Sequence, residues 1–181
     1  MRIIIVIIIA MHSLDCFALH SDLLVVDSLL KIQDDNLAYS KILKIDEFKL
    51  TNEDLIDYYL LKGRTERYLA LFYLSSKSLG QGINLLDTSD FSDRTYEFYF
   101  QLSIVTRNLH EFHLATEYAH KAEEIASILG NNSFLYESNL ILSSAYKSQK
   151  EIDSSLFYLK QAKKYINKTC LLYTSPSPRD S

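Results

Sequence analysis

The 181-residue chain is long enough to bury the core of one domain, and 48% of its residues are hydrophobic against 23% that are charged. Only 4 Gly and 2 Pro occur, and because both residues break helices, their scarcity favours long helices over many short strands. The formal net charge of −4 provides no overall positive field, which argues against a nucleic-acid partner for this portion of the chain.

The first 18 residues have the pattern of a secretory signal peptide. Met1 and Arg2 precede an apolar run over residues 3–11, and a small residue, Ala18, follows it. The run is shorter than the ~20 apolar residues that a membrane-spanning helix needs. We therefore expect cleavage after Ala18 and export, to the periplasm in a bacterium. The alternatives are a buried strand rich in Ile and Val, or a chain anchored in the membrane with this part outside the cytoplasm.

Residues 19–50 are expected to form an atypical helical hairpin at the start of the fold. Residues 22–32 and 36–45 both have helical patterns, but they match the later part of the sequence poorly. Terminal hairpins of repeat proteins are often atypical because only one of their faces is covered.

From residue 51 onward the sequence repeats every 40 residues, which gives three repeats at about 56–95, 96–135 and 136–169. Three positions in each repeat hold a small residue: Gly63, Ser103 and Ser143; Ser75, Ala115 and Ser155; Gly82, Ala122 and Ala162. Small side chains let two helices approach closely, so the pattern predicts antiparallel hairpins that pack tightly and stack on one another.

This order of small, aromatic and apolar positions resembles the tetratricopeptide repeat, most clearly over residues 102–126, LSIVTRNLHEFHLATEYAHKAEEIA. The resemblance covers about residues 51–167 and implies an all-α fold, a right-handed α-solenoid of antiparallel helical hairpins. The repeat is 40 residues long rather than ~34, it lacks Trp, and no Pro closes it. In these respects it is similar to the longer repeats of bacterial sensors and regulators.

The C-terminal segment has a different composition. Residues 170–180 read CLLYTSPSPRD and contain both prolines, and they look like the translation of an adapter used to prepare DNA sequencing libraries. We predict that residues 170–181 are a non-native tail and that the native chain continues differently after Thr169; the alternative is a natural disordered tail. Cys16 and Cys170 both lie in these excluded ends, so the predicted fold contains no disulfide and no reactive thiol.

No catalytic, cofactor or metal motif is found, and we predict that the chain is not an enzyme. His110 and His113 are three residues apart, whereas the helix of a zinc protease places its two histidines four apart. His113, Glu117 and His120 follow one helical stripe and could hold a metal, but a solvated polar face produces the same pattern. We favour the solvated face.

The remaining candidate is a binding groove. In tetratricopeptide stacks the first helix of each hairpin lines the concave face, which implies groove residues Leu60, Arg64, Arg67, Phe100, Ile104, Arg107, Leu140 and Lys147. Across the repeats, related positions form an acidic row, an apolar row and a basic row: Asp57, Glu97 and Glu137; Leu60, Phe100 and Leu140; Arg67, Arg107 and Lys147. An apolar strip between opposite charges suits an extended peptide or an amphipathic helix. The alternative is that these charges only complement the helix dipoles.

The signal-peptide pattern and the resemblance together predict an exported scaffold that binds a protein or peptide partner. The resemblance to bacterial regulators further implies that the scaffold is the sensory part of a truncated regulator. The alternative is a soluble periplasmic protein with an assembly or co-chaperone role. In either case a membrane is involved only through the signal peptide or through a missing C-terminal segment.

Overall fold

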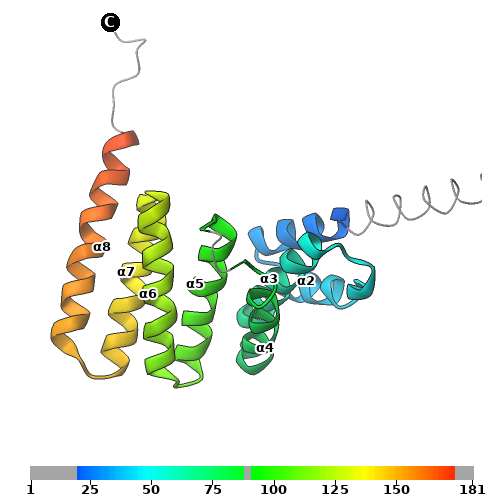
Figure 1. The fold of residues 1–181 in the computed structure, drawn as a ribbon, viewed down its shortest axis with the longest axis horizontal. Coiled ribbons are helices and arrows are strands. Elements are labelled where there is room, and N and C mark those ends of the chain that lie inside the picture. Colours follow the sequence, from blue (N-terminus) through cyan, green and yellow to red (C-terminus); the bar gives the residue numbers. More distant parts are fainter. Residues whose placement is uncertain (1–19, 88–90, 174–181) are drawn as a thin grey trace, which may run out of the picture. The chain divides into compact units, whose positions relative to one another are not determined.

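The computed structural model describes residues 20–87 and 91–173, with side chains up to residue 166, and every regular element in these ranges is helical. A helix over residues 20–31 is followed by α2 (Asp35–Ile42) and a short 3-10 helix, η1 (Glu47–Lys49). Three hairpins follow: α3 (Asn52–Tyr68) with α4 (Phe72–Ile83), α5 (Asp93–Asn108) with α6 (Phe112–Leu129), and α7 (Asn132–Ser148) with α8 (Ile152–Tyr173) (Figure 1). The predicted all-α fold of antiparallel helical hairpins is confirmed.

The chain divides into two compact units. Unit 1 is Met1–Asp87 and holds the first hairpin with the helices that precede it; unit 2 is Thr88–Ser181 and holds the second and third hairpins. The hairpins begin at Asn52, Asp93 and Asn132, three or four residues before the repeat boundaries expected from the sequence. Among the described residues, no helix is both long and apolar enough to cross a lipid bilayer.

The signal peptide and the non-native tail, which the sequence predicts at the two ends of the chain, remain predictions. Residues 1–18, the predicted signal peptide, and residues 174–181 lie outside the described residues. Helix α8 continues to Tyr173, four residues into the segment predicted to be non-native.

Small residues hold the two helices of each hairpin together. All nine positions of the three small rows are buried. In unit 1 the Ser75 hydroxyl donates a hydrogen bond to the Gly63 carbonyl across the hairpin at 2.7 Å, and in unit 2 the hydroxyls of Ser143 and Ser155 are 3.1 Å apart. Each pair is twelve residues apart in the sequence, which confirms that the small rows mark the closest approach of the two helices.

The turn inside each hairpin repeats as regularly as the side chains. Ala70, His110 and Lys150 are 40 residues apart, and each is left-handed, with φ of 59°, 65° and 65°. In all three turns the amide of the next residue donates to a carbonyl five residues earlier, at 2.8, 2.9 and 3.0 Å. This arrangement closes a helix end and is usually built on glycine. None of the three residues is glycine, so the positions of glycine in the sequence do not reveal these turns.

Each unit has its own apolar core. In unit 1, Leu23, Val26 and Leu30 of the first helix pack with Ile42 of α2 and Tyr58 of α3. In unit 2, a cluster joins helices α5, α6 and α7 through Tyr96, Ala122, Ile125, Ala126 and Leu135. The N-terminal helical pair, expected as an atypical hairpin, therefore packs on the first repeat.

Replacing Gly63 by Ala is expected to destabilise the first hairpin. The added Cβ would lie 2.5 Å from Leu79 Cγ and 2.6 Å from Cδ2, and the Leu79 side chain is fully buried. Overpacking of this kind costs about 1–3 kcal/mol of unfolding free energy, measured by urea denaturation. Gly80→Ala is the matched control: its Cβ would meet no atom within 4 Å, so this variant should be more stable than the parent. Equal effects of both changes would contradict the close contact.

Lys150→Gly is expected to stabilise the third hairpin, because glycine adopts the left-handed conformation without the ~1–2 kcal/mol that other residues incur. The matched control is Lys160→Gly in the middle of α8, which removes the same charge but should lower stability by about 1 kcal/mol. Thermal unfolding followed by circular dichroism measures both. A loss of stability in Lys150→Gly would show that the turn is not held as described.

Candidate partner-binding face

Five of the eight predicted groove residues lie on α5 and α7, the first helices of the two hairpins of unit 2. These two helices contact each other directly. Phe100 and Ile104 on α5 and Leu140 on α7 are half-buried, whereas Lys147 is exposed. We call the surface formed by Phe100, Ile104, Arg107, Leu140 and Lys147 the α5–α7 face.

Arg107 ties the two helices together at the basic end of this face. Its guanidinium Nη1 donates a hydrogen bond to Ser144 Oγ at 2.6 Å. Burial lowers the pKa of Arg107, but the ordinary value for arginine is so high that the side chain remains charged at neutral pH. A partly desolvated cation attracts a carboxylate more strongly than an exposed lysine does, because the local dielectric constant is lower.

Glu137 lies at the acidic end of the face. The Tyr96 hydroxyl from α5 is within hydrogen-bond distance of both Glu137 Oε2, at 3.3 Å, and the Phe134 carbonyl, at 3.2 Å. The Tyr96 ring also stacks on the Phe134 ring, with centroids 3.9 Å apart. Burial raises the pKa of Glu137; the bond from Tyr96 opposes this rise, and the negative charge of Glu97 adds to it.

The helix dipole accounts for only one of the two charged rows. Arg67, Arg107 and Lys147 each lie in the last turn of their helix, where the dipole favours a positive charge. The acidic row lies beyond the first turn of each helix, where the dipole has little effect: the first-turn acids are Glu53 and Asp54 in α3 and Asp93 in α5. The dipole therefore does not account for the positions of Glu97 and Glu137.

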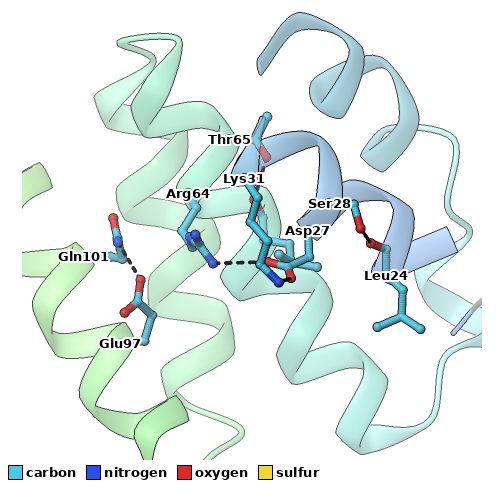
Figure 2. A network of polar contacts seen from close by, with 9 residues as sticks. Leu24, Asp27, Ser28, Lys31, Arg64, Thr65, Glu97 and Gln101 are labelled. Atoms are coloured by element: carbon cyan, nitrogen blue, oxygen red, sulfur yellow. Dashed lines mark hydrogen bonds and ion pairs between the residues drawn. The ribbon is translucent and has the colours of Figure 1, made fainter. Parts of the chain in front are cut away.

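The other three predicted residues, Leu60, Arg64 and Arg67, lie on α3 in unit 1. Leu60 is buried, and the Arg67 guanidinium lies 4.0 Å from the centroid of the Tyr68 ring. Arg64 Nη1 is 3.6 Å from Asp27 Oδ1, and Asp27 also pairs with Lys31 at 2.6 Å, whereas Gln101 donates to Glu97 within unit 2 (Figure 2). Leu60 and Arg64 line a hollow of about 230 Å³ together with residues of the first helix.

Asp27 and Tyr96 were not predicted from the sequence. Asp27 lies in the N-terminal helical pair, which does not follow the 40-residue register. The repeat pattern therefore did not indicate that Asp27 pairs with Arg64. Tyr96 contacts residues 38 and 41 positions later, a separation that only the packing of successive first helices defines.

His120 of α6 is used in contacts with its neighbours. His120 Nε2 is 3.1 Å from the Tyr146 hydroxyl, and His120 Nδ1 is 3.6 Å from Glu123 Oε2. In the described part of the chain, no three His, Cys, Asp or Glu side chains are grouped as a metal site requires.

Hairpins of this kind, in a fixed register, define a helical-repeat protein of the tetratricopeptide-like solenoid class. Among solved structures, the chain is similar to two crystal structures of MamA, each with a TM-score of 0.63 and 18% identity. The matches cover 84% of this chain and 80% of that chain in one case, and 88% and 79% in the other. BtubC from P. vanneervenii matches with a TM-score of 0.50 and 14% identity, over 86% of this chain and 82% of that chain. No protein-family model and no curated protein sequence matches the chain.

Glu137→Gln is expected to stabilise the chain in a pH-dependent way. The pKa of Glu137 is raised in the folded state. The contribution of Glu137 to folding stability is therefore most favourable below its ordinary pKa of 4.5, and it declines as the pH rises through the raised pKa. Glutamine can still accept a bond from Tyr96 but carries no charge to desolvate. Urea denaturation should therefore show a higher free energy of unfolding for Glu137→Gln than for the parent at pH 7, and a smaller difference at pH 4.

Two further variants test whether the raised pKa of Glu137, and not a change in net charge, causes this gain in stability. Tyr96→Phe removes the hydrogen bond that opposes the rise in the Glu137 pKa, so it should lower stability more at pH 7 than at pH 4. Glu124→Gln, on an exposed position of α6, removes one negative charge without such a bond. A gain in Glu137→Gln that is the same at both pH values would contradict the assignment.

Proposed function

We propose that the protein is a scaffold whose α5–α7 face binds an extended peptide or an amphipathic helix of a partner protein. The Arg107–Ser144 bond carries the proposal, because it fixes the spacing of α5 and α7 beside apolar side chains that remain half-exposed. A helical-repeat fold without a catalytic constellation in its described part suits a role in protein interaction.

The charges of the face specify the chemistry of the partner. Arg107 and Lys147 favour a carboxylate at one end of the bound segment. Glu97 and Glu137, held close to each other beyond the reach of the helix dipole, favour a lysine, an arginine or a hydrogen-bond donor at the other. Between them, Phe100, Ile104 and Leu140 would contact apolar side chains of the partner. The bound segment is thus amphipathic and has a defined direction.

We also propose that the scaffold is exported. The apolar run over residues 3–11 and the small residue Ala18 support this proposal. The resemblance to the repeats of bacterial sensors favours a regulatory role, with a periplasmic assembly protein as the alternative. N-terminal sequencing of the chain recovered from the periplasm of a bacterial host tests the export: a start at residue 19 supports it, and an intact Met1 in the cytoplasm contradicts it.

The binding face is tested with peptides selected from a random display library on the purified chain. We expect selected peptides to combine apolar residues with a carboxylate, and to bind Arg107→Glu at least about tenfold more weakly, which corresponds to about 1.4 kcal/mol. Leu140→Ala should weaken the same peptides by removing an apolar contact. Isothermal titration calorimetry measures both.

Ser144→Ala is the matched control for Arg107→Glu. It removes the same interhelical hydrogen bond but keeps the positive charge, so a peptide that recognises the charge should lose much less affinity. If the selected peptides bind Arg107→Glu and Leu140→Ala as tightly as the parent, the α5–α7 face is not the binding site.

A further inference from the structure

The outer side of α8 is apolar and exposed. Four side chains that are between 39% and 56% exposed follow one another at helical spacing: Ile152, Leu156, Leu159 and Ile166. Residues separated by four, seven and fourteen positions lie along the same side of a helix. We call these four residues the α8 stripe. Lys163, eleven positions after Ile152, lies on the same side, so the stripe is apolar except for one lysine. Exposed apolar surface rimmed by polar residues marks an interaction site.

The 40-residue register shows what contacts this side of a second helix elsewhere in unit 2. The equivalent positions of α6 are Phe112, Thr116, Ala119 and Ala126, and α6 packs against α7. Ala119 and Ala126 are fully buried, and Gln149, which follows α7, donates a hydrogen bond to Thr116 Oγ1 at 2.6 Å. Gln149 also donates to the Phe112 carbonyl at 3.3 Å, and Ala126 packs in one cluster with Leu135 of α7. The α8 stripe therefore corresponds to the side of α6 through which the second hairpin stacks on the third.

A second apolar surface lies on the first helix of unit 1 and on the residue that follows it. Leu24, Val25 and Ile32 are between 44% and 72% exposed, and with Ser28 and Leu29 they line a shallow hollow of about 310 Å³. We call this surface the N-terminal patch. Leu23, Val26 and Leu30 on the other side of the helix supply the core of unit 1, and Leu29 packs against that core, so Leu24, Val25 and Ile32 are the patch residues that stay exposed.

The two surfaces have opposite charges around them. Residues 20–35, which contain the patch, have four Asp and one Lys, whereas residues 152–166, which contain the stripe, have three Lys and one Asp. Asp34 and Asp35 directly follow the patch, and Lys160 and Lys163 lie on α8 among the stripe residues. Opposite charges around apolar contacts orient two surfaces and speed their association.

We propose that the α8 stripe of one copy binds the N-terminal patch of a second copy. The contact continues the α6–α7 type of stacking across two molecules, with the first helix of the second copy in the position that α7 has against α6. The contact joins two different surfaces. In a pair of copies, the patch of one copy and the stripe of the other are therefore still free to bind further copies. Head-to-tail association of this kind is not limited to two copies.

Sedimentation equilibrium of the purified chain over a range of concentrations tests the proposal. The average mass should rise with concentration and should fall at high salt, which screens the charges around the contact. Leu159→Lys on the stripe and Val25→Lys on the patch should each reduce the chain to a monomer. Both positions are exposed, so circular dichroism should show unchanged helicity.

Mixing the two variants gives the decisive measurement. Leu159→Lys retains an intact patch and Val25→Lys retains an intact stripe, so an equimolar mixture should form a dimer and nothing larger. Phe48→Lys is the control, because the Phe48 side chain is 92% exposed and lies outside both surfaces; this variant should associate like the parent. The proposal is overturned if the parent stays monomeric, if either single variant still associates, or if the mixed variants do not pair.

Discussion

The close contact between the two helices of each hairpin is the constraint on which the rest of the structure depends. A side chain larger than serine does not occur at the nine buried small positions, and at Gly63 even a methyl group has no room beside Leu79. Where serine stands at these positions, its hydroxyl has a partner: Ser75 bonds the Gly63 carbonyl and Ser143 lies beside Ser155 across the hairpin, whereas Ser103 donates to the Phe100 carbonyl of its own helix. A buried hydroxyl without such a partner would cost free energy, so the small rows satisfy packing and hydrogen bonding together.

Tight hairpins determine where the exposed faces lie. In unit 2 the first helices of the two hairpins also meet, and α5 contacts α7. Their meeting line brings Arg107 to Ser144 at one end and Tyr96 to Glu137 at the other. The candidate face is thus a product of stacking, and no single helix carries it. The same reasoning applies to the α8 stripe, because α8 repeats the surface through which α6 packs against α7.

The sequence predicted the parts of the fold that rest on local pattern. The rows of small residues identified the hairpins and their close contacts, since small side chains at a fixed spacing are what two closely packed helices require. The left-handed turns at Ala70, His110 and Lys150 were not predicted, because their residue types carry no signal for that conformation. The division after Asp87 was also missed, since the 40-residue register continues across it.

The candidate site was predictable to a lesser degree. The register placed residues such as Phe100 and Leu140 on first helices, but it could not separate charges that only complement a helix dipole from charges held by neighbours. That distinction needed the actual helix ends, which put the bases in last turns and the acids beyond first turns. Asp27 contacts Arg64 from a helix outside the 40-residue register. Tyr96 contacts residues 38 and 41 positions later, so the repeat length brings the two helices together but does not say which side chains bond.

The hairpin turns have a consequence for how this fold can diverge. They are closed by backbone hydrogen bonds, and the second helices α4 and α6 begin without a side-chain cap, so few residue types are specified at that edge. Most of the specification therefore falls on the small positions and a modest set of apolar ones, and the remaining surface is free to change. Over long divergence, such a chain can keep its backbone while its sequence drifts. Such tolerance explains how two chains can share this fold, as this chain and MamA do, and be only 18% identical.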